Sequence, residues 1–100
     1  MAPVSVMDDV PSMPDLEEQK ALVESGDVEA QYLLGVIYEH VSGTPSNNIN
    51  AYMWFSIASE NESTKAARKM KFLEKKMSFT EIDEAQELAK KCKKRKYKGC

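Results

Sequence analysis

The chain has 100 residues, of which 42% are hydrophobic, 30% charged and 8% aromatic, and its formal net charge is −2. This composition is typical of one globular domain, and a chain so short has room for only one modest core, which excludes multi-domain enzymes, transporters and large cofactor clefts. The charge is unevenly distributed, because residues 1–50 hold nine acidic side chains and one basic one, while residues 51–100 hold seven acidic and thirteen basic ones.

The sequence predicts no membrane span and no secretory signal. No stretch of about 18 apolar residues could cross a bilayer, and residues 1–9 lack the basic start and apolar middle of a signal peptide. We therefore expect a cytoplasmic location for the chain as written, or a periplasmic or secreted one if Met1 was added to a mature exported chain.

The chain divides into three parts by composition. Residues 1–14 contain three of the four prolines among small and acidic residues, which predicts a flexible leader. Residues 15–96 carry helical patterns and form the predicted domain. Residues 97–100 are interpreted as the disordered end of a basic tail.

The first two predicted helices are marked by caps. Asp15 and Glu18 have the spacing of a capping box, and a short helix over 16–25 is followed by Gly26 as its left-handed stop. A second helix is predicted from Asp27 as N-cap to about His40. Its broad apolar face consists of Ala30, Leu33, Leu34, Ile37, Tyr38 and Val41.

Three more helices follow. Residues 42–48 are rich in Gly, Pro, Ser and Asn and predict a loop, with Asn47 capping a helix over 49–60. A fourth helix is expected over about 63–77, and Ser78 with Glu81 forms a second capping box that begins a fifth. The inward face of the third helix is predicted to be Ala51, Trp54, Phe55 and Ala58, with Ile49, Tyr52 and Met53 outside it.

An internal repeat then becomes visible. A shift of 36 residues places Ala30 on Ala66, and a period of this length that spans two helices is typical of stacked helical hairpins. The pattern Ala30-x3-Leu34-Gly35-x2-Tyr38, followed by Ala51-x2-Trp54-x3-Ala58, resembles the Sel-one-like repeat (SLR), a relative of the tetratricopeptide repeat. One full copy covers residues 26–66.

The resemblance implies an all-α fold, an α/α solenoid of stacked antiparallel helical hairpins with about five helices. It also implies adaptor or scaffold work in bacterial complexes, signalling or host contact. The sequence departs from the family pattern at four positions. The family has glycine at the positions of Val41 and Glu62, an aliphatic residue at Thr44 and aspartate at Asn47.

The candidate partner-binding residues lie on the faces opposite the predicted core, because the first helix of each pair lines the concave surface in repeat solenoids. Exposed aromatic residues are also common anchors of interfaces. The competing interpretation is that these side chains pack on neighbouring helices. The candidates are Tyr32, Val36, Glu39, Tyr52 and Met53.

The basic tail offers a second kind of site. Residues 90–100 contain seven lysine and arginine side chains, and such a run binds phosphates or an anionic membrane surface through release of counterions. The simpler interpretation is a solvated helix end that complements the helix dipole. The candidate anion-binding residues are Lys93, Lys94, Arg95, Lys96 and Lys98.

The reactive side chains are few. Cys92 and Cys100 could form a disulfide if the chain turns after Lys96, but the preferred interpretation is a buried Cys92 and a free thiol at Cys100. His40 is the only histidine, and it has no neighbouring catalytic pattern. We expect no metal, no cofactor, no small-molecule substrate and no enzyme activity.

The sequence therefore predicts a noncatalytic protein–protein interaction module that binds another protein or peptide, with self-association as a further possibility. The alternatives are a binder of nucleic acid or of an anionic membrane surface through the basic tail, and an inhibitor or immunity partner of a toxin.

Overall fold

The computed structural model describes residues 16–41 and 45–100, and within them the side chains of 18–40 and 47–100. The described residues form five α-helices and no strand, so the all-α class is confirmed. The predicted leader, residues 1–14, and the Asp15 half of the first capping box lie outside the described residues. The helices are α2 (Leu16–Glu24), α3 (Val28–Val41), α4 (Pro45–Glu60), α5 (Thr64–Glu74) and α6 (Phe79–Lys94).

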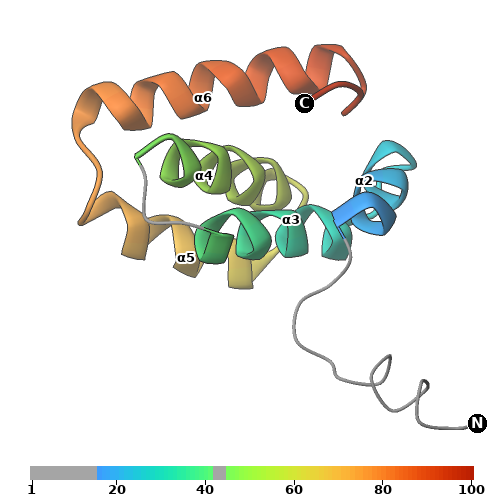
Figure 1. Cartoon of the computed structure of the whole chain (residues 1–100), viewed down its shortest axis with the longest axis horizontal. Helices are drawn as coiled ribbons and strands as arrows, with labels where there is room; N and C mark the ends of the chain where they lie inside the picture. The colour runs from blue at the N-terminus through green and yellow to red at the C-terminus, as the bar shows by residue number, and fades with distance from the viewer. Residues whose placement is uncertain (1–15, 42–44) are drawn as a thin grey trace, which may run out of the picture.

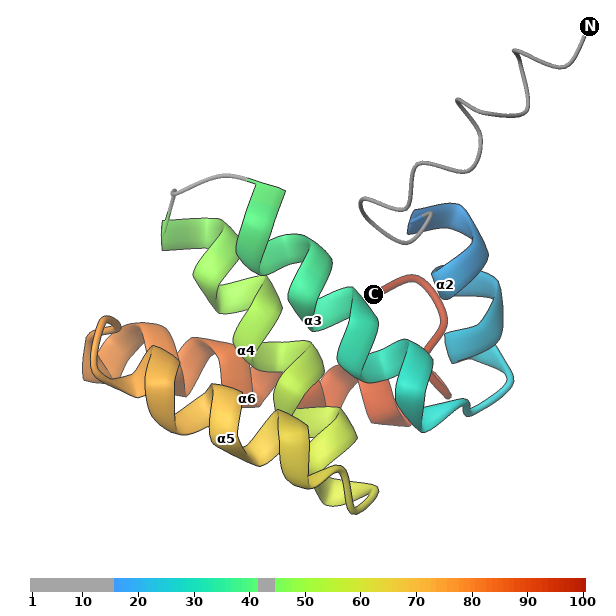
Figure 2. The same ribbon diagram turned by 90° about the horizontal axis from the view of Figure 1, so that it is seen from below.

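Helix α4 lies at the centre of the fold. It packs against α3, α5 and α6, while α2 packs against α3. Figure 1 shows α6 crossing one side of α4, with α3 and α5 on the other side. Figure 2 shows α3 running beside α4, as expected for a helical hairpin. This order of helices is compatible with the predicted solenoid. None of the described helices is long and apolar enough to cross a bilayer.

The central position of α4 explains its composition. Every residue from Ala51 to Ala58 is buried, and a helix that is apolar all round is one that is covered all round. The prediction that Tyr52 and Met53 lie outside the core face of this helix is therefore wrong. Met53, Trp54 and Ile57 belong to a core cluster shared with α2, α3 and α6. The other core cluster contains Ala51, Tyr52, Phe55 and Ala58 together with Leu73, Met77 and Ala85.

The predicted helix caps at Gly26, Asp27 and Ser78 are confirmed, and the predicted cap at Asn47 is wrong. Gly26 has φ 92°, which ends α2 in the left-handed conformation that glycine adopts without a steric penalty. The Ala30 amide donates to Asp27 Oδ1 at 2.9 Å, so Asp27 caps α3. Both hydrogen bonds of the Ser78–Glu81 capping box are present at the start of α6.

Two helix ends differ from the prediction. Helix α4 begins at Pro45 and not near residue 49, so Asn47 lies inside the helix. Proline fits the first helical position because it has no amide hydrogen there to leave unpaired, and its φ is already helical. Helix α5 ends at Glu74, three residues before the predicted end at Met77, and the chain turns before the Ser78 cap.

Small residues allow α3 and α4 to approach closely. A Cβ atom added to Gly35 would lie 2.5 Å from Cε1 of Phe55, a distance that no side chain tolerates without movement of the aromatic ring. Ala30, Ala51 and Ala58 are also buried, with at most 1% of their surface exposed. These small residues therefore lie where α3 and α4 cross closely.

Candidate functional site

The predicted concave face is partly covered by side chains of the neighbouring helix α5. Tyr32 lies against Phe55, with a ring centroid separation of 5.7 Å, and the ammonium of Lys65 on α5 sits 4.9 Å from the Tyr32 ring centroid. Glu39 pairs with Lys69 of α5 at 2.9 Å. Tyr32 and Val36 pack against the core cluster of Phe55 and Leu73. This face was interpreted either as a partner-binding surface or as a packing surface. The contacts seen in the structure are packing contacts.

Tyr52 and Met53 are not on the surface, since only 1% and 3% of them is exposed. The hydroxyl of Tyr52 donates to Glu74 Oε2 at 2.7 Å. Burial, the hydrogen bond and the negative charge of Glu74 together raise the pKa of Tyr52 to about 12. Tyr52 lines no pocket among the described residues, whereas Met53 forms part of the wall of a pocket of about 250 Å³ between α4 and α6.

The cysteines form a disulfide, so the expectation of a free thiol at Cys100 is wrong. The chain reverses through Lys96 and Tyr97, whose φ values are 56° and 67°, and the Tyr97 amide donates to the Cys92 carbonyl at 2.9 Å. This turn brings Cys100 back to Cys92, with 5.7 Å between their Cα atoms. The sequence did not favour this bond because the turn needs a left-handed backbone at two residues, Lys96 and Tyr97. Neither is glycine, the residue that usually marks such a conformation in a sequence.

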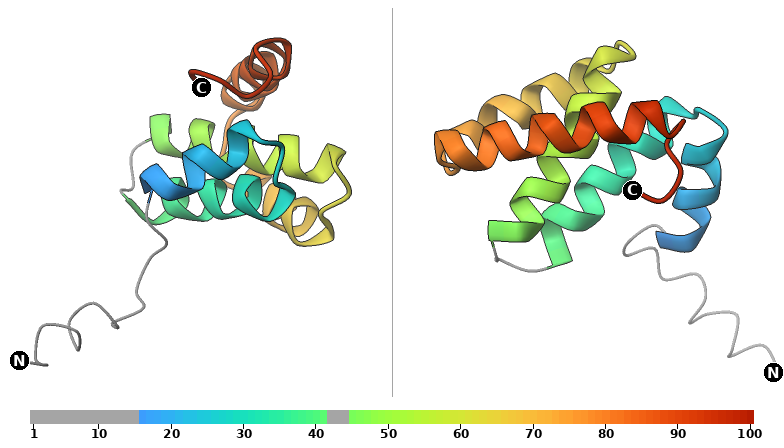
Figure 3. Two further views of the ribbon diagram at one scale, coloured as in Figure 1. Left: turned by 90° about the vertical axis from the view of Figure 1, so that its right-hand side faces the viewer. Right: turned by 90° about the horizontal axis from the view of Figure 1, so that it is seen from above.

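Residues 97–100 are consequently not a disordered tail. The side chains of Tyr97 and Cys100 pack against the core cluster that contains Trp54 and Val23. Figure 3 shows this C-terminal turn coming back from the end of α6 toward α2. We call residues 95–100 the C-terminal turn.

The predicted anion-binding residues are divided by the fold. Lys93 forms an ion pair with Glu60 of α4, and Nη1 of Arg95 donates to the Gly99 carbonyl at 3.5 Å. Lys94, Lys96 and Lys98 are exposed and form no ion pair with any described residue.

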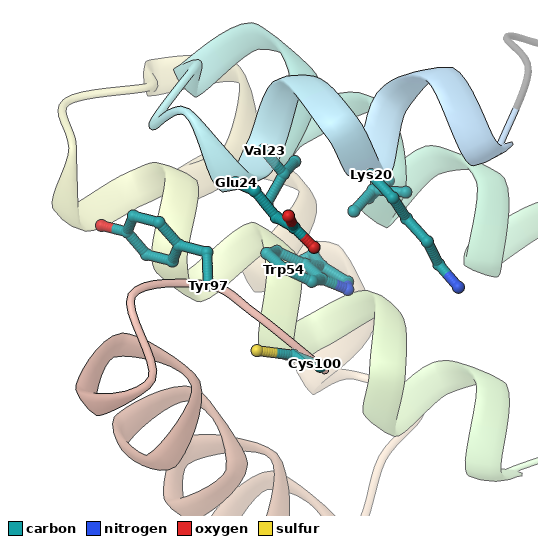
Figure 4. A pocket seen from close by; sticks show the side chains of 8 residues that line it. Lys20, Val23, Glu24, Trp54, Tyr97 and Cys100 are labelled. Atoms are coloured by element: carbon teal, nitrogen blue, oxygen red, sulfur yellow. The ribbon is translucent and has the colours of Figure 1, made fainter.

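A pocket of about 420 Å³ lies between α2, α4 and the C-terminal turn. Figure 4 shows Lys20 and Glu24 on α2, the ring of Trp54 on α4 across from them, and Tyr97 and Cys100 from the C-terminal turn. We call it the Trp54 pocket. Its lining consists of Lys20, Val23, Glu24, Leu34, Trp54, Tyr97, Gly99 and Cys100.

A polar network holds one wall of this pocket. The side-chain amide of Asn61 donates to Gln31 Oε1 at 3.0 Å and to the hydroxyl oxygen of Tyr97 at 3.4 Å. Gln31 comes from α3 and Asn61 from the turn after α4. The position of Tyr97 is thus fixed in two ways. Its hydroxyl is hydrogen-bonded to Asn61, and its backbone belongs to the turn that the disulfide closes.

Trp54 itself carries a buried donor. The residue is only 2% exposed, and its indole Nε1 has no hydrogen-bond partner among the described residues. In Figure 4 the nitrogen end of the ring lies on the side of the pocket where Lys20 stands. Buried polar groups are normally paired, so an unpaired indole N–H in a pocket wall is a candidate contact for a ligand.

The C-terminal turn separates this pocket from a second one. A cavity of about 250 Å³ lies between α4 and α6, and Gly99 and Cys100 line both pockets. The second pocket is also lined by Lys91 and Arg95. The turn therefore divides the surface of α4 that lies between α2 and α6.

No group of three His, Cys, Asp or Glu side chains that could hold a metal occurs in the described parts of the chain. The Nδ1 atom of His40 lies 2.9 Å from the Val36 carbonyl, within its own helix, and the side chain is exposed.

No protein-family model matches the chain, and neither a curated protein nor a solved structure matches it.

Sequence reasoning missed most of this site. Lys20 and Glu24 are four residues apart and therefore share one face of α2, and this spacing was the available signal. Trp54 was assigned to the core, which is correct, but its contact with a pocket depends on the C-terminal turn. Tyr97 and Cys100 could be placed only once the disulfide was recognised.

Proposed function

We infer that this protein is a noncatalytic interaction module that binds a segment of another protein. The single observation that carries this proposal is the Trp54 pocket. It is concave, its floor is formed by Val23, Leu34 and Trp54, which are buried, its partly exposed apolar wall by Tyr97 and Cys100, and its charged rim by Lys20 and Glu24. Such a combination is the general form of a binding site, in which apolar walls supply affinity and a few polar groups fix orientation.

The proposed relation to Sel-one-like repeats fits this function. The repeat-like residues Ala30, Gly35, Ala51 and Ala58 are buried where α3 and α4 meet, as the resemblance implies. Repeat modules of stacked hairpins bind partners with surfaces that adjacent helices build together. Here we assign that role to α2, α4 and the C-terminal turn, because α5 partly covers the α3 face of Tyr32.

The disulfide bears on the compartment. Intrachain disulfides persist in oxidising environments and are rare in the cytosol. The Cys92–Cys100 bond closes the turn that lines the pocket, so the proposed site requires such an environment. We therefore place the working protein in a periplasmic or extracellular setting, in preference to the cytoplasm.

A second candidate function rests on α6. The exposed side of this helix has a shallow depression lined by Glu87, Lys90, Lys91, Lys93 and Lys94. Lysines grouped in this way attract phosphate groups of nucleic acids or lipids, and the binding weakens steeply with salt. This surface keeps the anion-binding alternative open beside the peptide-binding one.

One experiment separates the two functions. Peptides selected from a random display library on the oxidised chain are titrated against the parent protein, Tyr97→Ala and Tyr32→Ala. We expect Tyr97→Ala to weaken binding about tenfold, which corresponds to about 1.4 kcal/mol, and Tyr32→Ala to have no such effect. Thermal unfolding of both variants controls for folding.

Two outcomes would contradict the proposal. The first is that peptides are selected whose affinity depends on Tyr32 and not on Tyr97. The second is that only acidic peptides are selected and that moderate salt abolishes their binding equally in the parent and Tyr97→Ala proteins. The second outcome would favour the lysine surface of α6.

A further inference from the structure

The buried indole N–H of Trp54 selects for a ligand that offers an acceptor. A buried donor left without a partner destabilises the protein, because its hydrogen bond to water is lost and not replaced. Nε1 of Trp54 is in this state with respect to the described residues. Nε1 is closed to solvent in this conformation, so an acceptor recovers this hydrogen bond only when the exposed rim side chains of Lys20 and Glu24 move aside for it.

The two opposite charges at the rim favour a dipolar ligand over one that carries a net charge. Lys20 and Glu24 line the pocket one turn apart on α2 and form no ion pair with each other. A carboxylate is attracted by Lys20 and repelled by Glu24, and an ammonium the reverse, so a net charge gains little from the pair. A neutral amide matches both, since its carbonyl accepts from Nε1 and its N–H donates to Glu24.

The remaining walls favour an apolar group. The buried side chains of Val23 and Leu34 form the floor, and the partly exposed residues Tyr97 and Cys100 line the same space. A volume of about 420 Å³ is within the size range of small-ligand pockets. The pocket therefore combines room for an apolar side chain with one donor and one acceptor position beside it.

We propose that the Trp54 pocket binds one aliphatic residue of a partner peptide, with the adjoining main-chain amide hydrogen-bonded to Trp54 Nε1 and Glu24. This inference rests on the proposed function and specifies the chemistry of its ligand. The pocket then recognises an apolar residue within an extended peptide segment, and not a free amino or carboxyl terminus.

The test uses the only tryptophan of the chain as its reporter. The ¹⁵N-labelled, oxidised full chain is titrated with N-acetyl-leucinamide while the indole N–H resonance is followed by NMR. We expect a saturable downfield shift, because hydrogen bonding deshields the proton. Three matched probes are 4-methylpentanoate, isopentylamine and N-acetylglycinamide, which carry respectively a negative charge, a positive charge and no side chain.

A matched pair of variants tests the acceptor. Glu24→Ala removes the rim carboxylate, and Glu18→Ala removes another exposed glutamate from the same helix. We expect Glu24→Ala to weaken N-acetyl-leucinamide binding several-fold, as expected for the loss of one hydrogen bond to a charged group, and Glu18→Ala to leave it unchanged.

The inference is overturned if N-acetyl-leucinamide does not move the indole resonance, or if the carboxylate or the amine binds as tightly. If library peptides bind in a way that depends on Tyr97 but do not shift the indole N–H resonance of Trp54, the amide contact is contradicted and the proposed function is not. An indole shift with the amide probe, combined with a library that yields no binding peptide, would show the reverse.

Discussion

Tyr52 ties the stability of the fold to alkaline pH. Its hydroxyl is buried and donates to Glu74, and its pKa is raised from 10.0 to about 12. Above pH 10 the unfolded chain loses this proton while the folded chain keeps it, so the stabilisation is complete below pH 10 and is lost as the pH rises toward 12. We expect a loss on the order of 2 kcal/mol over this window, measured by urea unfolding at a series of pH values.

The matched variant is Tyr52→Phe, which keeps the ring and removes the hydroxyl. Its unfolding free energy should fall less between pH 10 and pH 12 than that of the parent protein. Equal pH dependence in the two proteins would show that Tyr52 does not carry the effect.

Glu62 occupies a glycine position after α4. Its φ is 75°, a left-handed conformation that costs a residue with a Cβ atom about 1 kcal/mol. We expect Glu62→Gly to raise the unfolding free energy by about 0.5–1 kcal/mol, since glycine adopts this conformation without the steric penalty. Glu62→Ala retains a Cβ and serves as the control. If the alanine variant is as stable as the glycine variant, the strain is not at this position.

Single residues were predictable where the cause is local. Gly26 predicted the end of one helix and Asp27 the start of the next, and the structure confirms both. Glu62 was noted only through the family pattern, because nothing in glutamate itself signals a left-handed backbone. Tyr52 was placed on the wrong face because a helix covered on all sides has no periodicity to read.

At the scale of elements, the C-terminal turn depends on its disulfide. The bond closes a short loop between Cys92 and Cys100. It reduces the conformational entropy of the unfolded chain, and for a loop of this length this stabilises the folded protein by about 2 kcal/mol. We expect Cys100→Ser to lower the unfolding free energy by about this amount and to weaken binding of the selected peptides, because the turn lines the Trp54 pocket.

Reduction provides the control for this variant. Dithiothreitol should lower the stability of the parent protein to that of Cys100→Ser and should not change the variant further. If the reductant leaves both the stability and the peptide affinity of the parent unchanged, the bond neither supports the turn nor shapes the pocket.

Side-chain caps predicted the starts of α3 and α6 correctly, but not the start of α4. Ser78 and Glu81 cap α6 as expected, since a capping box is a contact between residues three apart. The start of α4 was placed four residues late, because Pro45 was interpreted as part of a loop when it is the first residue of the helix. The sequence signal for proline at a helix start is the same as for proline in a turn.

At the scale of the molecule, the all-α class and the number of helices in the described chain followed from apolar periodicity and caps. The candidate site did not, because it joins Lys20 on α2, Trp54 on α4 and Tyr97 near the C-terminus. These residues are far apart in sequence, and only packing brings them together. The sequence left two interpretations of the Tyr32 face open, partner binding and packing, and its contacts with α5 are those of packing.

The location of peptide binding tests the account most directly. Backbone amide resonances of the oxidised chain are followed by NMR during titration with a library-selected peptide. We predict that the largest shifts fall on residues 20–24 and 97–100, which line the Trp54 pocket from two sides. Largest shifts at Tyr32 and Glu39, or along residues 90–94 of α6, would contradict it.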